Sequence, residues 1–216
     1  MRIFLDTANI DQIRQAARLG VVSGITTNPS LVSKEGPIDY EAVIKEICSV
    51  ISGPVSTEVV VEGVEPMIEQ ARQISTWAPN VVIKIPSTAE GLEVTSALAK
   101  EGIKVNLTLC FSLNQALLGA LAGAAYVSPF VGRLDDIGDN GMGLVEDIVE
   151  VFEYYQLSTE VIAASIRHPQ HCVAAAKAGA HIATVPYDVL MQMIRHPLTD
   201  IGVSRFLSDW QRISQK

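Results

Sequence analysis

The sequence predicts an α/β protein in which eight parallel strands, each followed by a helix, close into a (β/α)8 barrel. Two observations favour this fold. Short runs rich in β-branched residues alternate with longer amphipathic segments, and the runs are almost continuously apolar, which is typical of parallel strands covered on both faces. An open doubly wound sheet is the competing fold, but the first run leads into Asp6-Thr7-Ala8-Asn9 and not into a glycine-rich dinucleotide turn.

The expected elements follow one another with short loops. We expect strands, in chain order, at Arg2–Asp6, Gly24–Asn28, Val55–Val60, Val81–Pro86, Lys104–Leu109, Tyr126–Val131, Glu160–Ser165 and His181–Pro186. We expect helices at Asp11–Leu19, Ile38–Ile51, Glu65–Trp77, Glu90–Glu101, Ser112–Leu121, Gly141–Tyr155, Gln170–Ala178 and Tyr187–Arg195. Glycines recur where a helix gives way to a strand, and we expect them in the left-handed conformation that ends helices: Gly20, Gly53, Gly102, Gly123 and Gly179.

No linker or low-complexity stretch divides the chain, so we expect one domain over residues 1–216. Its last part, residues 197–216, is expected to form a C-terminal helical extension. Within Pro197–Ser214, apolar residues recur at helical spacing, namely Val203, Phe206, Leu207, Trp210 and Ile213. A closed barrel is already covered by eight helices, so this additional apolar face is not needed to cover it.

Composition and charge narrow the function classes. Hydrophobic residues make up 48% of the chain and charged residues 19%, which describes a globular protein. The formal net charge is −8, and the cations are scattered, so we expect no nucleic-acid partner. The apolar runs are too short for a bilayer span, and Asp6 interrupts any signal sequence, so we expect no membrane association. Three widely spaced cysteines without a CxxC motif indicate reduced thiols and a cytoplasmic protein.

Polar residues gather near the carboxyl ends of the predicted strands, where barrels of this kind carry their chemistry. Alternate residues of a strand share one face, and polar residues recur at this spacing or singly at similar depth. Any one of them could be a helix cap, but seven of the eight strand ends carry one, which indicates a site. These residues are Asp6, Thr26, Asn28, Glu58, Lys84, Asn106, Thr108, Ser128, Ser165 and Arg167.

Lys84 is the most informative of these residues. It lies in the strand Val81-Val82-Ile83-Lys84-Ile85-Pro86, which would bury its amine among apolar neighbours. Burial disfavours a charged ammonium and leaves a neutral amine that can attack a carbonyl carbon. The alternative is a structural ion pair with Asp6 or Glu58, although such buried pairs contribute little net stability.

The neighbouring polar residues suggest distinct roles. Asp6 could act as a general base opposite Lys84; its alternative is to cap the first helix, for which Asn9 or Asp11 is better placed. Glu58 and Thr108 could hold a water that enters and leaves during imine formation. The amides Asn28 and Asn106 suit sugar hydroxyl groups.

Two arginines are candidates for binding a phosphate. Arg133 and Arg167 follow the sixth and seventh predicted strands, where their guanidinium groups could grip a phosphate together with Ser165. The alternative is that they pair with the nearby acids Asp135 and Asp136.

Two other motifs suggest metals but are better explained otherwise. His168-Pro-Gln-His171 has ligand-like spacing without a third ligand, and a helix that begins after Pro169 accounts for it. The acidic segment 135–141 lacks the spacing of a calcium loop, and we interpret it as a loop and helix start over the active site. We expect neither a metal nor an organic cofactor.

With these strand ends identified, the chain resembles the short, single-barrel transaldolases, a subfamily that also contains fructose-6-phosphate aldolase and has the TIM-barrel fold. The resemblance covers essentially the whole length. The motifs that carry it are LDTAN at 5–9, TTNPSL at 26–31, VVIKIP at 81–86, NLTL at 106–109, YVSPFVGRLDDIG at 126–138 and AASIRHPQH at 163–171.

The resemblance implies a role for each candidate residue. Lys84 would form the Schiff base, Asp6 would transfer the proton of the C4 hydroxyl group, and Glu58 and Thr108 would hold the catalytic water. The dihydroxyacetone end of a ketose phosphate would contact Asn28, Asn106 and Ser128, and the phosphate would contact Arg133, Ser165 and Arg167. The implied reaction transfers a dihydroxyacetone unit from fructose 6-phosphate or sedoheptulose 7-phosphate to an aldose phosphate, in the pentose phosphate pathway.

Two rival functions remain. The first is fructose-6-phosphate aldolase, whose members resemble this chain but carry glutamine and tyrosine where it has Glu58 and Phe130. The second is a non-catalytic sugar-phosphate-binding barrel, which would have no reason to keep Lys84, Asp6 and Glu58 together. The resemblance also implies a homodecamer, with the apolar face of Pro197–Ser214 packed on a neighbouring subunit.

Overall fold

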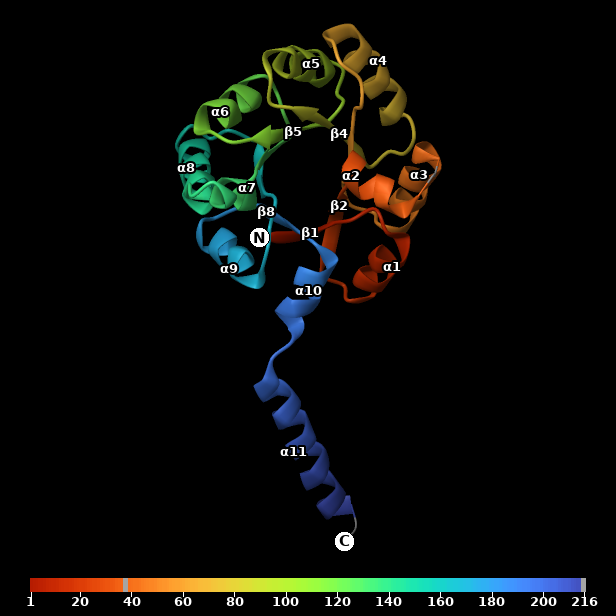
Figure 1. The fold of residues 1–216 in the computed structure, drawn as a ribbon, viewed down its shortest axis with the longest axis vertical. Coiled ribbons are helices and arrows are strands. Elements are labelled where there is room, and N and C mark those ends of the chain that lie inside the picture. Colours follow the sequence, from red (N-terminus) through yellow and green to blue (C-terminus); the bar gives the residue numbers. More distant parts are fainter. Residues whose placement is uncertain (37–38, 215–216) are drawn as a thin grey trace.

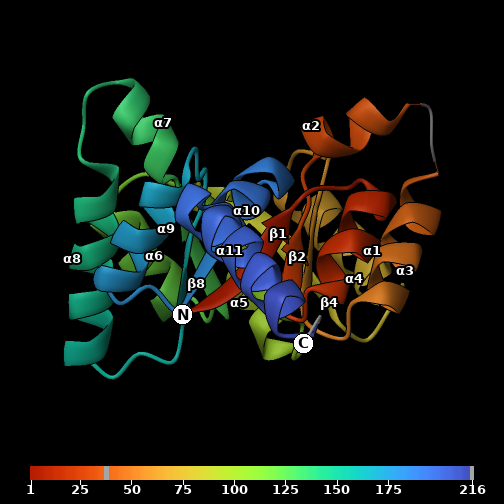
Figure 2. The same ribbon diagram turned by 90° about the horizontal axis from the view of Figure 1, so that it is seen from below.

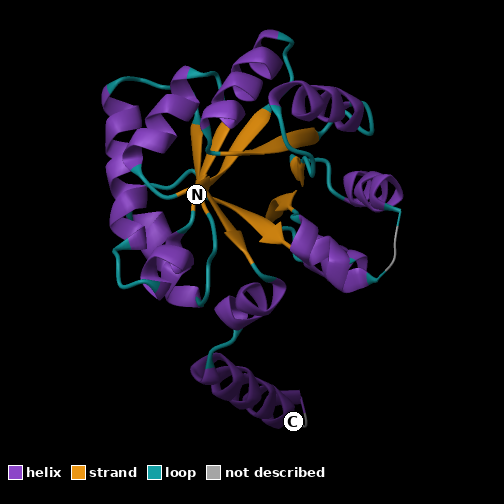
Figure 3. Ribbon diagram, turned by 45° about the horizontal axis from the view of Figure 1, so that its top comes forward, coloured by secondary structure: helices purple, strands orange, loops and turns teal. Residues whose placement is uncertain are grey.

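A computed structural model describes residues 1–36 and 39–214 and has the predicted architecture. Eight parallel strands form a closed barrel in the order β1-β2-β3-β4-β5-β6-β7-β8. Helices surround the barrel on its outside, as Figures 1 and 3 show. The prediction of a (β/α)8 barrel with an additional C-terminal helix is confirmed.

The observed strands lie close to the predicted ones. They are β1 (Arg2–Asp6), β2 (Val22–Thr26), β3 (Val55–Glu58), β4 (Val81–Pro86), β5 (Val105–Cys110), β6 (Tyr126–Pro129), β7 (Glu160–Ala163) and β8 (Ile182–Val185). Strand β2 begins and ends two residues before its predicted bounds. Val22 pairs with Ile3 of β1, while Asn28 already caps the following helix.

The principal helices also match the expected segments. They are α1 (Ile10–Arg18), α3 (Tyr40–Val50), α4 (Val64–Ser75), α5 (Ala89–Lys100), α6 (Leu113–Leu121), α8 (Gly141–Tyr154), α9 (Pro169–Lys177), α10 (Tyr187–Ile194) and α11 (Pro197–Ser214). The predicted start of α3 at Ile38 lies outside the described residues. Three short elements were not predicted: α2 (Pro29–Val32), η1 (Ser33–Glu35) and α7 (Val131–Asp136). They are too brief to show helical periodicity, and α7 occupies part of the segment that we expected to be a loop.

Local sequence explains several helix ends. The side chain of Asn9 caps α1 by accepting a hydrogen bond from the amide of Gln12, so Asp6 is not the cap of this helix. Four of the five predicted glycines are left-handed, but Gly53 is not, and that prediction is wrong. Gly53 is required for space instead, because a Cβ there would lie 1.9 Å from the carbonyl oxygen of Ser23.

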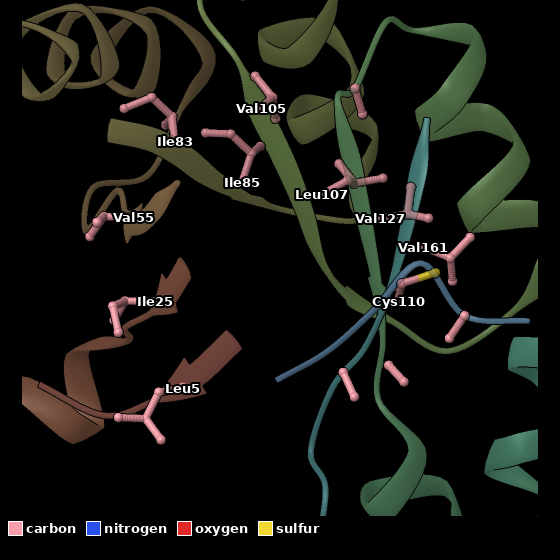
Figure 4. Packing of buried hydrophobic residues seen from close by; sticks show 14 of the residues in the cluster. Leu5, Ile25, Val55, Ile83, Ile85, Val105, Leu107, Cys110, Val127 and Val161 are labelled. Carbon is pink, nitrogen blue, oxygen red and sulfur yellow. The ribbon is translucent and has the colours of Figure 1, made fainter. Parts of the chain in front are cut away.

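Each strand has an outer and an inner face. Outward side chains pack against the surrounding helices in the main core, and Figure 4 labels ten of them, among them Leu5, Ile83 and Leu107. The lower interior of the barrel is filled by a second cluster of buried residues, consisting of Phe4, Val82, Tyr126, Ile162 and Ile182. Gly24 belongs to the same layer, and a Cβ on it would lie 2.6 Å from the ring of Phe4. The ring of Phe4 therefore fills the space that Gly24 leaves.

The C-terminal helix α11 projects away from the barrel (Figure 1) and contains no buried residue. Its large apolar side chains are exposed, including Phe206 at 74% and Trp210 at 67%. An apolar face of this size on a protein surface marks an interaction site more often than a solvated surface. Among the described residues, none of the helices combines the length and the apolar character required to cross a membrane.

Candidate active site

The upper interior of the barrel is polar and lies directly above the apolar layer. Residues two positions after the lower layer point into the same interior, because side chains alternate along a strand. Thus Asp6 follows Phe4, Lys84 follows Val82, and Ser128 follows Tyr126. The strands align these residues side by side: Asp6 pairs in register with Thr26, Glu58 with Lys84, and Lys84 with Asn106.

A cavity opens at this end of the barrel, below α2 and α7, which stand on the same side of the molecule in Figure 2. Its walls come from seven of the eight strands or the turns that follow them, since only β3 is missing. It is lined by Asp6, Thr26, Asn28, Lys84, Thr108, Ser128, Phe130, Arg133, Ala164, Ser165, Ile166, Arg167, Thr184 and Pro186. A neighbouring cleft lined by Glu58, Lys84 and Thr108 continues toward α2 and η1.

Lys84 is buried at the centre of the site, with 5% of its surface exposed. Its Nζ donates a hydrogen bond to the carbonyl oxygen of Thr27 at 2.9 Å and lies 3.2 Å from Oε2 of Glu58. From the sequence, the alternative role of Lys84 is a structural ion pair with Asp6 or Glu58, and the structure contains the pair with Glu58. However, Lys84 also lines the open cavity, so its amine can be reached from solvent by a ligand.

Asp6 lies across the interior on β1 and is held by a chain of hydroxyl groups. The Oγ1 of Thr26 donates to Oδ1 of Asp6 at 2.7 Å and lies 2.6 Å from Oγ1 of Thr184. Because Thr26 has a single hydroxyl hydrogen, Thr184 must donate to Thr26 in this arrangement. Burial raises the pKa of Asp6, while the charge of Lys84 and the hydrogen bond from Thr26 act in the opposite direction. A carboxylate with a raised pKa is a stronger base.

Asn106 and Ser128 form a fixed polar pair beside Lys84. Ser128 donates to Oδ1 of Asn106 at 2.7 Å, and Nδ2 of Asn106 donates to Oγ of Ser56 at 3.1 Å. Thr108, two residues further along β5, has a buried hydroxyl oxygen with no hydrogen-bond partner in the described chain. An unpaired buried hydroxyl is costly, and a ligand or water in the cavity would relieve that cost.

Asn28 has a structural role in addition to its place in the cavity wall. Its Oδ1 accepts a hydrogen bond from the amide of Leu31 at 2.9 Å and so caps α2, with Pro29 at the first helical position. Because Oδ1 is used in the cap, the side-chain nitrogen Nδ2 of Asn28 is the donor that can face a ligand. Asn28 is therefore both a helix cap, as the alternative interpretation of polar strand ends proposed, and a residue of the cavity wall.

The other end of the cavity carries the two arginines. The guanidinium carbon of Arg133 lies 5.4 Å from the ring centroid of Phe130. Arg167 pairs with Asp136 at 2.8 Å, as its structural alternative anticipated, but both side chains are more than half exposed. An exposed pair of this kind is weak, so an anion in the cavity can compete for Arg167. Ser165 has a φ of 59°, in the left-handed region that non-glycine residues adopt uncommonly.

The structure brings the sequence-predicted residues together. Ten of the twelve line one cavity, while Glu58 contacts Lys84 and Asn106 contacts Ser128. Sequence reasoning missed Thr184, which orients Thr26 from β8, the one strand end to which no polar residue was assigned. The alternation rule could have identified Thr184, because it lies two residues after Ile182 and two before Pro186. It also missed Thr27, since its contribution to Lys84 is a backbone carbonyl that any residue type supplies.

The fold and this cavity define a (β/α)8-barrel protein with a buried lysine at the carboxyl ends of its strands, where enzymes of this fold carry their active sites. Residues 3–216 match the family described as Transaldolase/Fructose-6-phosphate aldolase, and the chain belongs to this family.

Three curated relatives are similar over the complete length of both chains, and each is named "Probable transaldolase". The protein from Dehalococcoides mccartyi is 62% identical over 216 residues, with 100% of each chain covered. Those from Desulforudis audaxviator and Thermoanaerobacter sp. are 60% and 58% identical, again with 100% of each chain covered.

Proposed function

We propose that this protein is a transaldolase that transfers a dihydroxyacetone unit from a ketose phosphate to an aldose phosphate through a Schiff base on Lys84. The observation that carries the proposal is the amine of Lys84, which is buried, hydrogen-bonded and open to a polar cavity. The family membership and the relatives named as probable transaldolases support the same activity.

The first step is condensation of Lys84 with the C2 ketone of the donor. Glu58 lies 3.2 Å from Nζ and is placed to accept a proton from the ammonium. The free amine adds to the carbonyl carbon, and the adduct loses the carbonyl oxygen as water to give the imine. Glu58 and the unpaired hydroxyl of Thr108 are suited to binding that water as it leaves.

The second step is cleavage between C3 and C4. Asp6 takes the proton of the C4 hydroxyl group, C4 becomes the aldehyde carbon of the departing aldose phosphate, and the bonding electrons move into the protonated imine. The product on Lys84 is an enamine. Because the imine accepts the electron pair, the reaction needs no Lewis acid, and activity is expected to survive treatment with EDTA.

The third step returns the three-carbon unit to an acceptor. The enamine carbon attacks the aldehyde carbon of a second aldose phosphate, and protonated Asp6 gives its proton to the new C4 oxygen. Water then adds to the imine and releases the ketose phosphate, which restores the amine of Lys84. We assign the hydroxyl groups of the dihydroxyacetone unit to the Asn106–Ser128 pair, in which Ser128 lines the cavity and Asn106 accepts its hydrogen bond.

Binding of the phosphate is assigned to Arg133, Arg167 and Ser165 at the far end of the same cavity. These arginines must attract an anionic substrate to a protein whose formal net charge is −8. Planar guanidinium groups bind phosphate oxygens in a bidentate manner, which also fixes the orientation of the sugar relative to Lys84.

The aldolase reaction is the second candidate, and Phe130 argues against it. This ring lines the cavity and packs edge-on against Phe111 at a centroid distance of 5.6 Å. A phenyl ring cannot hold a water near the enamine, whereas a tyrosine hydroxyl could help to protonate the enamine and release dihydroxyacetone.

A coupled assay for glyceraldehyde 3-phosphate distinguishes transaldolase from aldolase. Fructose 6-phosphate is the donor, and the assay is run with and without the acceptor erythrose 4-phosphate. We expect turnover to require the acceptor. Phe130→Tyr should raise cleavage without acceptor and lower transfer, and adding Glu58→Gln should move the ratio further the same way. A wild-type enzyme that releases free dihydroxyacetone as fast as it transfers it would instead be an aldolase.

We also propose that residues 1–216 form one domain and that the protein assembles as a homodecamer. The exposed apolar face of α11, centred on Phe206, Leu207 and Trp210, is the surface proposed to pack on a neighbouring subunit. Sedimentation of a 23.3 kDa monomer at micromolar concentration would refute this assembly. The cytoplasm is the proposed location, since Cys48, Cys110 and Cys172 are all free.

A further inference from the structure

The turns after β6 and β7 form one connected unit. The amide of Val131 donates to the carbonyl oxygen of Ala164 at 2.9 Å, and the amide of Gly132 donates to that of Ser165 at 3.1 Å. Arg133 and Arg167 are each carried by one of these turns. The relative position of the two arginines therefore depends on how well the two turns are held together.

His171, on the first turn of α9, bridges the two turns with both of its ring nitrogens. Its Nδ1 accepts a hydrogen bond from the backbone amide of Arg167 at 3.3 Å. Its Nε2 lies 3.1 Å from Oδ2 of Asp135 on α7. The other oxygen of Asp135 accepts from the amide of Gly141, where α8 begins. The ring of His171 thus links the backbone of Arg167 to α7, the helix that carries Arg133.

These contacts require one particular form of the ring. Because Nδ1 accepts from an amide, it carries no hydrogen, so Nε2 carries the hydrogen and donates it to Asp135. The pKa of His171 is lowered, because burial and the neighbouring His168 outweigh the opposite effect of Asp135. The neutral ring that these contacts require is therefore the form present at neutral pH.

Arg167 passes close to Gly132 on the neighbouring turn. A Cβ on Gly132 would lie 2.6 Å from Nε of Arg167 and 2.3 Å from the carbonyl oxygen of Ser165. The arginine side chain therefore crosses Gly132 in direct contact and ends at Asp136 on α7, at 2.8 Å. His171 fixes the backbone end of Arg167, and the exposed Asp136 holds only its far end.

We infer that His171, oriented by Asp135, is a positioning residue that sets the distance between the two phosphate-binding arginines. The inference rests on the proposed function, in which Arg133 and Arg167 bind the substrate phosphate. It also assigns a role to the His168-Pro-Gln-His171 motif beyond the start of α9. A shift of a substrate-positioning group by about 1 Å can cost a large factor in the rate, even when the reacting groups are intact.

The test compares a phosphorylated with an unphosphorylated donor. His171→Ala loses both contacts, so KM for fructose 6-phosphate should rise about ten-fold, while KM for fructose should change little. Asp135→Asn should give a smaller rise, because asparagine keeps one carbonyl oxygen that can still accept from Nε2 and loses only the charge and the acceptor for the amide of Gly141. His171→Gln retains one acceptor and one donor and should recover most of the affinity.

His168→Ala is the matched control. Its ring lies beside that of His171, with a centroid distance of 3.8 Å, but its side chain does not cap α9. This variant should leave the ratio of the two KM values close to that of the wild type. Thermal unfolding of every variant, with kcat for both donors, separates loss of positioning from loss of fold.

Arg167→Ala is measured alongside to separate two kinds of failure. If it raises KM selectively for fructose 6-phosphate and His171→Ala does not, the inference is overturned and the proposed phosphate site stands. If Arg167→Ala affects both donors equally, the phosphate site and the inference built on it both fail. An equal loss for both donors in His171→Ala, or no recovery in His171→Gln, would mean that His171 is only structural.

Discussion

The barrel interior has two layers, only two residues apart on the same strands, with opposite properties. The lower layer is closed by Phe4, Val82, Ile162 and Ile182, none of which exposes more than 1% of its surface. The upper layer holds the hydroxyl, amide, carboxylate and amine groups that line the cavity. Because side chains alternate along a strand, one strand can supply a buried apolar residue and a polar cavity residue with a single residue between them.

The comparison explains why the reactive groups stay in place. The apolar layer lies below Lys84 and Asp6, so these residues are desolvated on one side and open to the cavity on the other. Each is fixed by a strand neighbour, Glu58 for Lys84 and Thr26 for Asp6. Changes in the upper layer should therefore alter catalysis without unfolding the barrel, and changes in the lower layer should do the opposite.

Asp6→Asn, in the upper layer, should lose more activity and less stability than Phe4→Ala in the lower layer. The amide cannot take the C4 hydroxyl proton, so kcat for transfer should fall by about 10²- to 10⁴-fold, the usual contribution of a general base. Thermal unfolding should remain close to that of the wild type. Steady-state kinetics and calorimetry on the same preparation check both parts, and an activity loss below ten-fold would remove Asp6 from the mechanism.

Phe4→Ala, two residues away, should show the reverse pattern. Removing the ring leaves a cavity beside Gly24, and truncation of a fully buried phenylalanine costs about 3–5 kcal/mol of unfolding free energy. Denaturant unfolding measures this loss. The kcat of the folded fraction should stay within a few-fold of the wild type; a selective collapse of kcat at wild-type stability would mean that the two layers are not separate.

Thr26→Val tests the smallest of these effects, which is a shift in pH dependence. The hydroxyl of Thr26 stabilises the ionised form of Asp6, so its removal should raise the pKa of Asp6 further. Because the base must be ionised to work, the acidic limb of kcat/KM should move to higher pH. Thr184→Val, which touches Asp6 only through Thr26, should shift the limb less; an unchanged or opposite shift in Thr26→Val would contradict the hydroxyl chain.

The two layers also show what the sequence could predict. The alternation of short apolar runs with amphipathic segments was sufficient to predict the barrel, and polar residues near the strand ends indicated the upper layer, including Lys84, Asp6 and Glu58. A closed barrel brings the carboxyl ends of all strands together, so the prediction needed no pairwise contacts. The lower layer was not predicted by name: the strands are apolar on both faces, so only the two-residue step back from Asp6 or Lys84 identifies Phe4 and Val82 as interior residues.

The features that the sequence did not predict depend on local backbone geometry. The short helices α2 and α7 have only four and six residues, which leave no periodic signal. Gly53 was expected to be left-handed, but it is needed for a close approach to Ser23 that no sequence pattern encodes. The pairing of Arg167 with Asp136 could be anticipated only as an alternative, since it depends on where α7 ends.

Trapping the imine tests the central claim most directly. Fructose 6-phosphate with borohydride should inactivate the enzyme irreversibly, and peptide mapping by mass spectrometry should place a reduced three- or six-carbon adduct on Lys84. Lys84→Arg, which keeps the charge beside Glu58 but cannot form the imine, should be neither labelled nor active, with a loss of about 10⁶-fold, as for other lost nucleophiles. An adduct on Lys100 or Lys104, or transfer activity that survives in Lys84→Arg, would contradict the account.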